Sequence, residues 1–261
     1  MIRKLTMEDH QQVENYLQVL PSFSLFLVAD IEKYGYDSSV FTVWGIFSHT
    51  GDLLHVFGKY YHTLVVYSNT AAYPAAEVNA FLSDQAIEYD TILGRSVLVE
   101  PFLADLSFAQ IFRNYYCELN RENFTPLINQ AINVTKADLS QTKAILNLLA
   151  SIKEFPRASF QEDALNTYIA DDGVYLIMED DEIASLAMCS ARTAGLANIG
   201  GVCTAKPYRR KGYASTVVSA LSKKYLEQGL ICCLGYNNPE AGAIYQRLGY
   251  QTVGHIIIAT K

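Results

Sequence analysis

The sequence predicts an α/β protein of two similar domains, each a mixed sheet flanked by helices. Three observations lead to this fold class. The chain has 261 residues, which at about 150 residues per domain corresponds to two domains or one large one. Its second half alternates strand-like and helix-like hydrophobic patterns. A weak internal repeat, at an offset of about 130 residues, indicates that the first half is a copy of the second.

The repeat rests on two pairs of matching segments. Residues 2–9 and 132–138 each combine a short apolar strand pattern with an Asp near a helix start. Further along, residues 41–56 and 174–188 each show a hairpin pattern with turn-forming residues at the centre. Two copies of one fold explain both matches, and chance resemblance is the alternative.

The expected domains are residues 1–125 and 131–261, joined near 121–130. Charge divides in a similar way, because residues 1–125 hold 7 Lys and Arg against 15 Asp and Glu, a net of −8. The total of −7 argues against nucleic acid as a partner. No stretch approaches ~18 apolar residues and no secretory signal is evident, so we expect no membrane partner and a cytoplasmic location.

The cysteines show no metal-ligand pattern. No CxxC pair occurs, and an odd count with one adjacent pair makes a poor disulfide framework. We therefore expect no bound metal, and cysteines that are small buried residues in a reducing compartment. The five are Cys117, Cys189, Cys203, Cys232 and Cys233.

In the second half, apolar residues at helical spacing predict helices over 139–152 and 160–169. A third helix places Ala214 and Tyr225 on one apolar face and ends at Gly229. The last helix has Asn238 as its cap and Gly249 as its stop, with Pro239 in the first turn. Between the helices, runs of strand length predict a hairpin over 174–190 and strands over 196–203, 230–234 and 251–259.

The segment from Val202 to Ala214 joins the end of a strand to the start of a helix. The first amides of a helix lack acceptors and carry partial positive charge, so they can bind phosphate. Gly212 permits a tight turn and close approach of a ligand, and Arg209, Arg210 and Lys211 add positive charge. The segment predicts a phosphate-binding loop, with a plain basic loop as the alternative.

Two motifs resemble the GCN5-related N-acetyltransferase (GNAT) superfamily. Arg209-x-x-Gly212-x-Ala214 is similar to its acyl-CoA pyrophosphate loop, [QR]-x-x-G-x-[GA]. Downstream, the segment from Asn238 to Tyr250 is similar to the family helix N-x-x-A-x-x-x-Y-x-x-x-G-[FY]. The resemblance implies that each domain holds a mostly antiparallel mixed sheet, with a central parallel pair of strands in the C-terminal copy.

The resemblance also implies residue roles. Tyr245 would protonate the departing CoA thiolate, a plausible transfer for a phenol of pKa about 10; simple packing of its ring is the alternative. Backbone groups of 202–204 would pair with the pantetheine arm, amides of 210–215 would hold the pyrophosphate, and Asn238 would bond the cofactor. The implied cofactor-binding residues are Val202, Cys203, Thr204, Arg209, Arg210, Lys211, Gly212, Tyr213, Ala214, Ser215 and Asn238.

The sequence departs from the family pattern in two respects. Arg210 stands where the family often has glycine. The strand 196–204 contains no carboxylate that could act as general base, and Asn198 cannot take a proton. Glu154, Tyr236 and ordered water are the remaining candidates for that role. Because the amine would attack the thioester directly, Cys203 is expected to be a strand residue and not a nucleophile.

The first half resembles a degenerate copy of the same family domain. Its segment 68–84, at the position of the loop, has no glycine and contains Pro74, Glu77 and Asp84, which suit a pyrophosphate badly. This degenerate-then-active order is similar to the glycine N-acyltransferase-like branch. Ten tyrosines and Trp44 lie in this half, and they either complete the acceptor pocket or form core.

The expected function is therefore an N-acetyltransferase that moves an acetyl or other acyl group from acetyl-CoA to a primary amine by direct attack. A small-molecule amine is the expected acceptor, with a protein amine as the alternative. A non-catalytic CoA-binding regulatory module is the competing function, because the strand 196–204 offers no obvious base.

Overall fold

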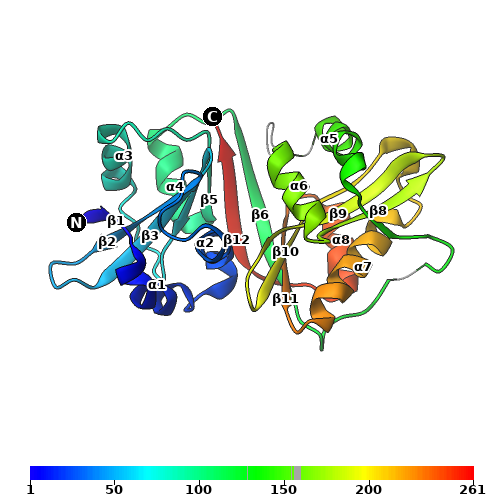
Figure 1. Cartoon of the computed structure of the whole chain (residues 1–261), viewed down its shortest axis with the longest axis horizontal. Coiled ribbons are helices and arrows are strands. Elements are labelled where there is room, and N and C mark those ends of the chain that lie inside the picture. Colours follow the sequence, from blue (N-terminus) through cyan, green and yellow to red (C-terminus); the bar gives the residue numbers. More distant parts are fainter. Residues whose placement is uncertain (128, 154, 156–159) are drawn as a thin grey trace. The chain divides into compact units, whose positions relative to one another are not determined.

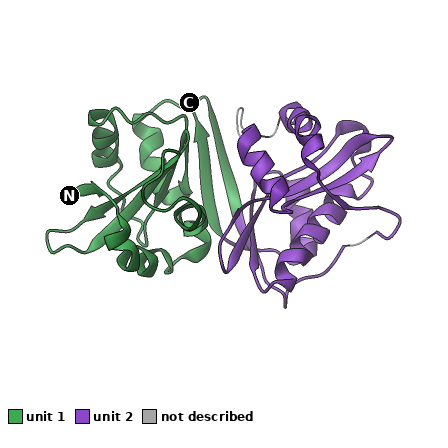
Figure 2. Cartoon of the chain, viewed as in Figure 1, with its two compact units in different colours: residues 1–115, 254–261 green, residues 116–253 purple. Residues whose placement is uncertain are grey.

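The computed structural model describes every residue except 128, 154 and 156–159. The chain forms two compact units (Figure 2). Unit 1 comprises residues 1–115 and 254–261, and unit 2 comprises residues 116–253. Each unit holds a mixed sheet with helices on its faces, which confirms the predicted fold class. Among the described residues, no helix is long and apolar enough to cross a membrane.

Unit 1 has strand order β1-β2-β3-β4-β5-β12, and its β4 and β5 run parallel (Figure 1). Val66 of β4 packs into a core with α3 and α4, whereas the hydroxyl of its neighbour Tyr67 accepts from the Leu20 amide beside α2. The sheet is thus covered on both faces. The elements are β1 (Ile2–Lys4), α1 (His10–Leu17), α2 (Pro21–Tyr34), β2 (Phe41–Phe47), β3 (Leu53–Tyr60), β4 (Thr63–Tyr67), α3 (Ala75–Asp84), β5 (Thr91–Arg95), α4 (Ser96–Asp105) and β6 (Gln110–Leu119).

Unit 2 has strand order β6-β11-β10-β9-β8-β7, with β10 and β11 parallel. The parallel pair confirms the prediction for the C-terminal copy. Its elements are β7 (Thr135–Lys136), α5 (Thr142–Ser151), α6 (Glu162–Ala170), β8 (Val174–Glu179), β9 (Glu182–Arg192), β10 (Leu196–Thr204), α7 (Tyr213–Glu227), β11 (Ile231–Tyr236) and α8 (Pro239–Leu248). The last strand, β12 (Gln251–Thr260), starts in unit 2 and belongs to unit 1 from Gly254 onward. Short 3-10 turns at Met7–Asp9, Leu139–Gln141 and Lys206–Tyr208 precede α1, α5 and α7.

The two faces of the unit 2 sheet have separate cores. Ala197 and Ile199 of β10 pack with α7 and α8, whereas Leu186 and Met188 of β9 pack with α5 and α6. Alternation along a strand sends successive side chains to opposite faces. Asn198 and Gly200 therefore lie on the face away from α7.

The division of the chain differs from the predicted domain ranges 1–125 and 131–261. Residues 254–261 belong to unit 1, because β12 pairs with β5 from Ile256 to Thr260 and places Ile257 and Ala259 in the unit 1 core. Unit 1 otherwise ends at Tyr115, within β6. An apolar strand pattern indicates a strand but not the strand with which it pairs. The sequence therefore could not show that β12 joins the sheet of unit 1.

Candidate active site

The loop between β10 and α7 has a left-handed backbone at two positions. Arg210 has φ +63° and Gly212 has φ +83°, and α7 begins at the next residue, Tyr213. The Gly212 carbonyl accepts the Thr216 amide at 3.1 Å and the Ser215 hydroxyl at 2.8 Å. The amides of the first turn have no helical carbonyl four residues back. The turn therefore presents amides at an exposed helix start, as the phosphate-loop prediction requires.

The basic side chains of this loop are exposed but differ in what they contact. The Arg209 guanidinium donates through Nε to the Thr204 carbonyl at 3.2 Å, which ties the loop to the end of β10. The Lys211 ammonium lies 5.2 Å from the ring centre of Tyr208 and 6.0 Å from that of Tyr213. Lys211 thus contacts the aromatic side of the loop, and Arg210 is the exposed cation at its left-handed turn.

Tyr213 anchors the start of α7. Its ring is buried, and its hydroxyl donates to the Glu179 carboxylate at the end of β8. That hydrogen bond, with burial and the carboxylate charge, raises the pKa of Tyr213. The Tyr208 hydroxyl donates in the same way to Glu182, at 3.3 Å. Of the residues predicted to bind cofactor, Tyr213 therefore offers its backbone and not its side chain.

Upstream of the loop, β10 contains a bulge. Gly200 is paired with Met188 and Cys203 with Leu186, so β10 has one more residue than β9 between these pairs. Gly201 adopts φ +58°, and a Cβ there would lie 2.6 Å from Met188 Cε. Only glycine meets both conditions. Two adjacent glycines inside a strand pattern, Gly200 and Gly201, are the sequence signal for such a bulge.

The parallel strands β10 and β11 separate partway along their length. They are paired from Leu196 with Ile231 to Asn198 with Cys233. Both strands are fully described and continue to Thr204 and Tyr236, with no further paired residues between them. We call the last pair, Asn198 and Cys233, the fork. Above the fork, β10 and β11 are no longer paired with each other, and the predicted segment 202–204 lies in this part of β10.

The backbone of that segment is partly used by the protein. The buried Ser185 hydroxyl donates to the Cys203 carbonyl at 2.8 Å, and Arg209 Nε donates to the Thr204 carbonyl. Val202 lies in the bulge without a partner on β9. Of the segment, Val202 is thus the residue whose backbone the neighbouring strand leaves open.

Tyr245 of α8 is buried, with 6% of its surface exposed. Burial raises its pKa well above the usual value, and the thiols of Cys203 and Cys117 contribute to the shift. Its ring lies 5.5 Å from that of Tyr236 and 6.0 Å from that of Tyr250. Tyr245 packs in the core between the sheet and helices α7 and α8, which Ile199 of β10 also joins, whereas the Cys203 side chain packs in the core on the other face.

Asn238 caps α8 as predicted. Its side-chain oxygen accepts the Glu240 amide at 2.9 Å, and its carbonyl accepts the Gly242 amide at 2.9 Å. Gly249 ends the helix with φ +101°, also as predicted. The exposed Asn238 amide group keeps its nitrogen available to a ligand at the end of β11.

The structure does not single out any of the side chains considered as general base. Asn198 is buried and hydrogen-bonded through both ends of its amide. Tyr236 is half-buried against α8, where Gly242 leaves room for its ring. Glu154 lies outside the described residues. Proton removal is thus not assigned to a side chain of β10.

All five cysteines are buried and form no disulfide, which confirms the expected burial. Within the described ranges, no cluster of three or more His, Cys, Asp or Glu side chains could hold a metal ion. Burial raises the pKa of Cys117, Cys189 and Cys232. These three thiols are therefore poor nucleophiles at neutral pH.

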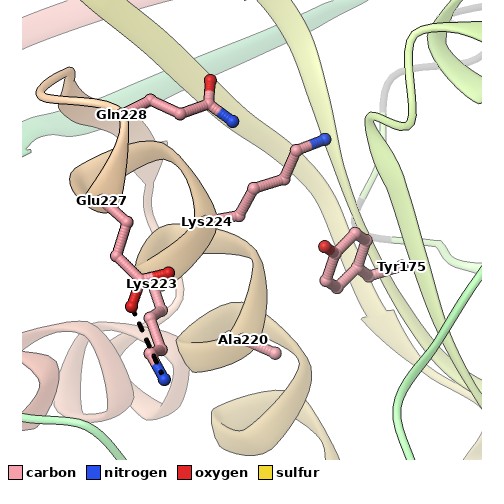
Figure 3. A pocket seen from close by; sticks show the side chains of 6 residues that line it. All are labelled: Tyr175, Ala220, Lys223, Lys224, Glu227 and Gln228. Atoms are coloured by element: carbon pink, nitrogen blue, oxygen red, sulfur yellow. Dashed lines mark ion pairs between the residues drawn. The ribbon is translucent and has the colours of Figure 1, made fainter.

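An open depression of about 350 Å³ lies beside the C-terminal half of α7 (Figure 3). Its lysines are already engaged. Lys223 pairs with Glu227 at 3.6 Å, and Lys224 donates to the Asp172 carbonyl at 2.5 Å. Its lining residues on α7 begin at Ala220, about 10 Å along the helix from Tyr213, and extend to the end of the helix opposite the loop. It is therefore separate from the predicted phosphate-binding loop.

Comparison with known proteins places a family sequence inside unit 2. Residues 142–250 match the model of the acetyltransferase (GNAT) family. The Bacillus subtilis (strain 168) protein YyaT is 37% identical over 62 residues, which are 23% of this chain and 42% of YyaT. The match therefore spans less than half of that relative. The family match lies within unit 2, so residues 142–250 are the part of the chain whose sequence is similar to the GNAT family.

Solved structures extend the likeness to the whole chain. A GCN5-related N-acetyltransferase from Sphaerobacter thermophilus has a TM-score of 0.64 at 13% identity, covering 100% of this chain and 95% of its own. A tandem GNAT protein from the clavulanic acid biosynthesis pathway has a TM-score of 0.57 at 12% identity, covering 100% and 98%. A GNAT acetyltransferase from Colwellia psychrerythraea has a TM-score of 0.55 at 16% identity, covering 100% and 99%. At these identities the likeness shows the fold.

Proposed function

We propose that unit 2 binds acetyl-CoA at the β10–α7 loop and transfers its acetyl group to a primary amine. One observation carries the proposal: β10 and β11 part above Asn198, β10 then leads into the loop that Gly212 turns at the start of α7, and Tyr245 lies in the core on the α7 side of the same sheet. A strand edge, an anion-binding helix start and a buried phenol are thus supplied by consecutive elements of one domain. The GNAT match over 142–250 supports the same reading.

The loop supplies the pyrophosphate site in this proposal. The first-turn amides of Tyr213, Ala214 and Ser215 donate to phosphate oxygens, and Arg209, Arg210 and Lys211 supply countercharge. Asn238 donates through its free amide nitrogen to the pantetheine arm. Backbone groups of Val202, Cys203 and Thr204 line that arm along β10.

The reaction is a direct acyl transfer. The neutral amine attacks the thioester carbonyl, and its nitrogen forms the new C–N bond. A backbone N–H near Val202 polarises the carbonyl as negative charge develops on its oxygen. The C–S bond then breaks, Tyr245 donates its proton to the departing thiolate, and the ammonium proton leaves through solvent. Tyr245 is protonated at neutral pH, as a proton donor must be; burial raises its pKa above the value of about 10 expected from the sequence, which makes the phenol a weaker acid than a free tyrosine.

We assign unit 1 a supporting role and no CoA site. Its acidic balance favours a cationic acceptor, for which we propose a small-molecule amine ahead of a protein side chain. Buried cysteines without disulfides fit a reducing cytoplasm. The order of units, degenerate before active, resembles the glycine N-acyltransferase-like branch.

A non-catalytic CoA-binding module is the second candidate. It is favoured by one observation, namely that β10 bears no carboxylate and its Asn198 is fully engaged. In such a module the loop would hold the cofactor and no acceptor would react.

Substitution of Tyr245 by Phe distinguishes the two functions. For an enzyme we expect turnover of acetyl-CoA with an amine panel to fall ~10²–10⁴-fold, because only the leaving-group proton is lost. Acetyl-CoA affinity measured by calorimetry should stay within ~3-fold. Tyr250→Phe is the matched control, since Tyr250 is also buried in this ring cluster but bonds to Ser222.

Equal turnover in wild type and Tyr245→Phe would contradict the acid role. A wild type that binds acetyl-CoA and acetylates none of the amines would favour the binding module.

A further inference from the structure

The fork is closed by a buried polar cluster. The Tyr116 hydroxyl of β6 donates to Asn198 Oδ1 at 3.4 Å, and Asn198 Nδ2 donates to Ser190 Oγ of β9 at 2.8 Å. Asn198 is 7% exposed and Tyr116 is 2% exposed. Three strands therefore contribute one side chain each to a connected network at the level where β10 and β11 stop pairing.

This network lies directly below the bulge. A Cβ on Gly200, two residues above the fork, would meet Ser190 Oγ at 3.4 Å and Asn198 Nδ2 at 3.6 Å. Two residues of strand span about 7 Å. The Asn198 and Ser190 side chains thus reach up to the level of Gly200, on the face away from α7.

The cluster resists displacement. A buried amide that loses its partners costs free energy, so Asn198 is held in place by both Tyr116 and Ser190. Its polar surface also gives a methylene chain no favourable contact. A ligand group that descends between the strands meets a fixed and polar obstacle.

We propose that Asn198, positioned by Tyr116 and Ser190, is the floor of the acyl pocket and restricts the donor to short acyl groups such as acetyl. The inference rests on the proposed function, in which pantetheine lies along 202–204 and the acyl group points toward the fork. In that arrangement the thioester lies at the bulge, where Asn198 Nδ2 comes within 3.6 Å of the position of a Cβ on Gly200, so that only a short acyl group fits above the amide. Each extra methylene then meets the Asn198 amide.

The test compares calorimetric affinities for acetyl-, butyryl- and hexanoyl-CoA, which needs no acceptor. Wild type should bind acetyl-CoA at least ~10-fold more tightly than butyryl-CoA, the range expected when extra methylenes do not fit. Asn198→Ala removes the amide that blocks longer chains. It should bring the two affinities to within ~3-fold of each other, because butyryl- and hexanoyl-CoA bind more tightly while the affinity for acetyl-CoA is unchanged.

Ser222→Ala is the matched control. Ser222 is a buried, hydrogen-bonded side chain of unit 2 on α7, bonded to the Tyr250 hydroxyl at 2.8 Å. Its loss should lower stability and leave the acyl preference unchanged.

The outcomes separate this inference from the function on which it rests. Wild type that binds acetyl- and hexanoyl-CoA equally well overturns the floor alone, and this needs no variant to fold. An unchanged preference in a folded Asn198→Ala protein does the same. Failure of wild type to bind any acyl-CoA overturns the proposed function and the floor with it.

Discussion

The strand-to-helix junctions of the two units occupy the same place in the fold and differ in how their backbones are arranged. In each, a strand of a parallel pair (β4 or β10) leads into a helix (α3 or α7). In unit 2 the connection turns through left-handed residues at 210 and 212. In unit 1 the corresponding residues 68–74 are all described and none of them has a positive φ, and Pro74 precedes the helix.

The unit 1 junction is filled by its own side chains. The Ser68 hydroxyl accepts the Thr70 amide at 3.1 Å and lies 2.9 Å from His55 Nδ1, while Arg95 donates to the Ser68 carbonyl at 3.2 Å. Glu77 places a carboxylate in the first turn of α3. A helix start alone therefore does not make an anion site. The turn must leave amides open, and no acidic group may lie beside them.

The strands that lead into the junctions differ as well. β4 pairs with β3 in unbroken register, whereas β10 is bulged at Gly201. We expect Gly201→Ala to lower the free energy of unfolding by about 2–4 kcal/mol, from left-handed strain and the contact with Met188. Urea unfolding of the whole chain measures this, with Gly200→Ala as control.

Gly200 has a negative φ and only ordinary contacts for an added Cβ, the nearest at 3.4 Å. Its substitution should cost less than about 1 kcal/mol. Equal losses at the two glycines would mean that the bulge is not held by the conformation of Gly201.

Strands β1 and β7, at the outer edges of the two unit sheets, each carry an ion pair, and the two pairs allow a second comparison of the units with smaller expected effects. Arg3 donates to both Asp9 oxygens, at 2.8 and 2.5 Å, and lowers the pKa of Asp9 to about 2. Asp9→Asn should cost about 1–2 kcal/mol at pH 7, a value reduced for the exposed Arg3 partner. Lys136 and Asp172 in unit 2 pair at the surface, so Asp172→Asn should cost less.

The pH dependence follows from the direction of the shift. The folded pKa of Asp9 lies below its unfolded value of 3.8, so its stabilisation is complete above about pH 5 and disappears as the pH falls toward 2. The gap between wild type and Asp9→Asn should close over that range in thermal unfolding. A gap that is constant with pH would mean that Asp9 acts through packing and not through its charge.

Local signals made much of this structure predictable. Helix α8 begins after Asn238 and ends at Gly249 as expected, because the residues that start and end a helix act on backbone groups only a few residues away. The loop around Gly212 could be placed for the same reason. The sequence also marked Arg210 as unusual, and its φ of +63° lies in the region that glycine favours.

Tertiary features were harder to predict. The pairing of β12 with β5 in unit 1 depends on contacts more than 150 residues apart, which periodicity does not encode. The network of Asn198, Tyr116 and Ser190 joins three strands, and each residue alone looks unremarkable in the sequence. The bulge had a local signal in its paired glycines, but its position relative to the fork needed the structure.

The most direct measurement of the difference between the junctions is calorimetry of acetyl-CoA with wild type, Gly212→Trp and Ala71→Trp. Ala71 is the matched position, exposed in the unit 1 junction. The indole at 212 blocks charged hydrogen bonds worth about 1.5–3 kcal/mol each, so binding should weaken at least ~100-fold there and remain unchanged with Ala71→Trp. Equal affinity in all three proteins would contradict a cofactor site at the β10–α7 loop.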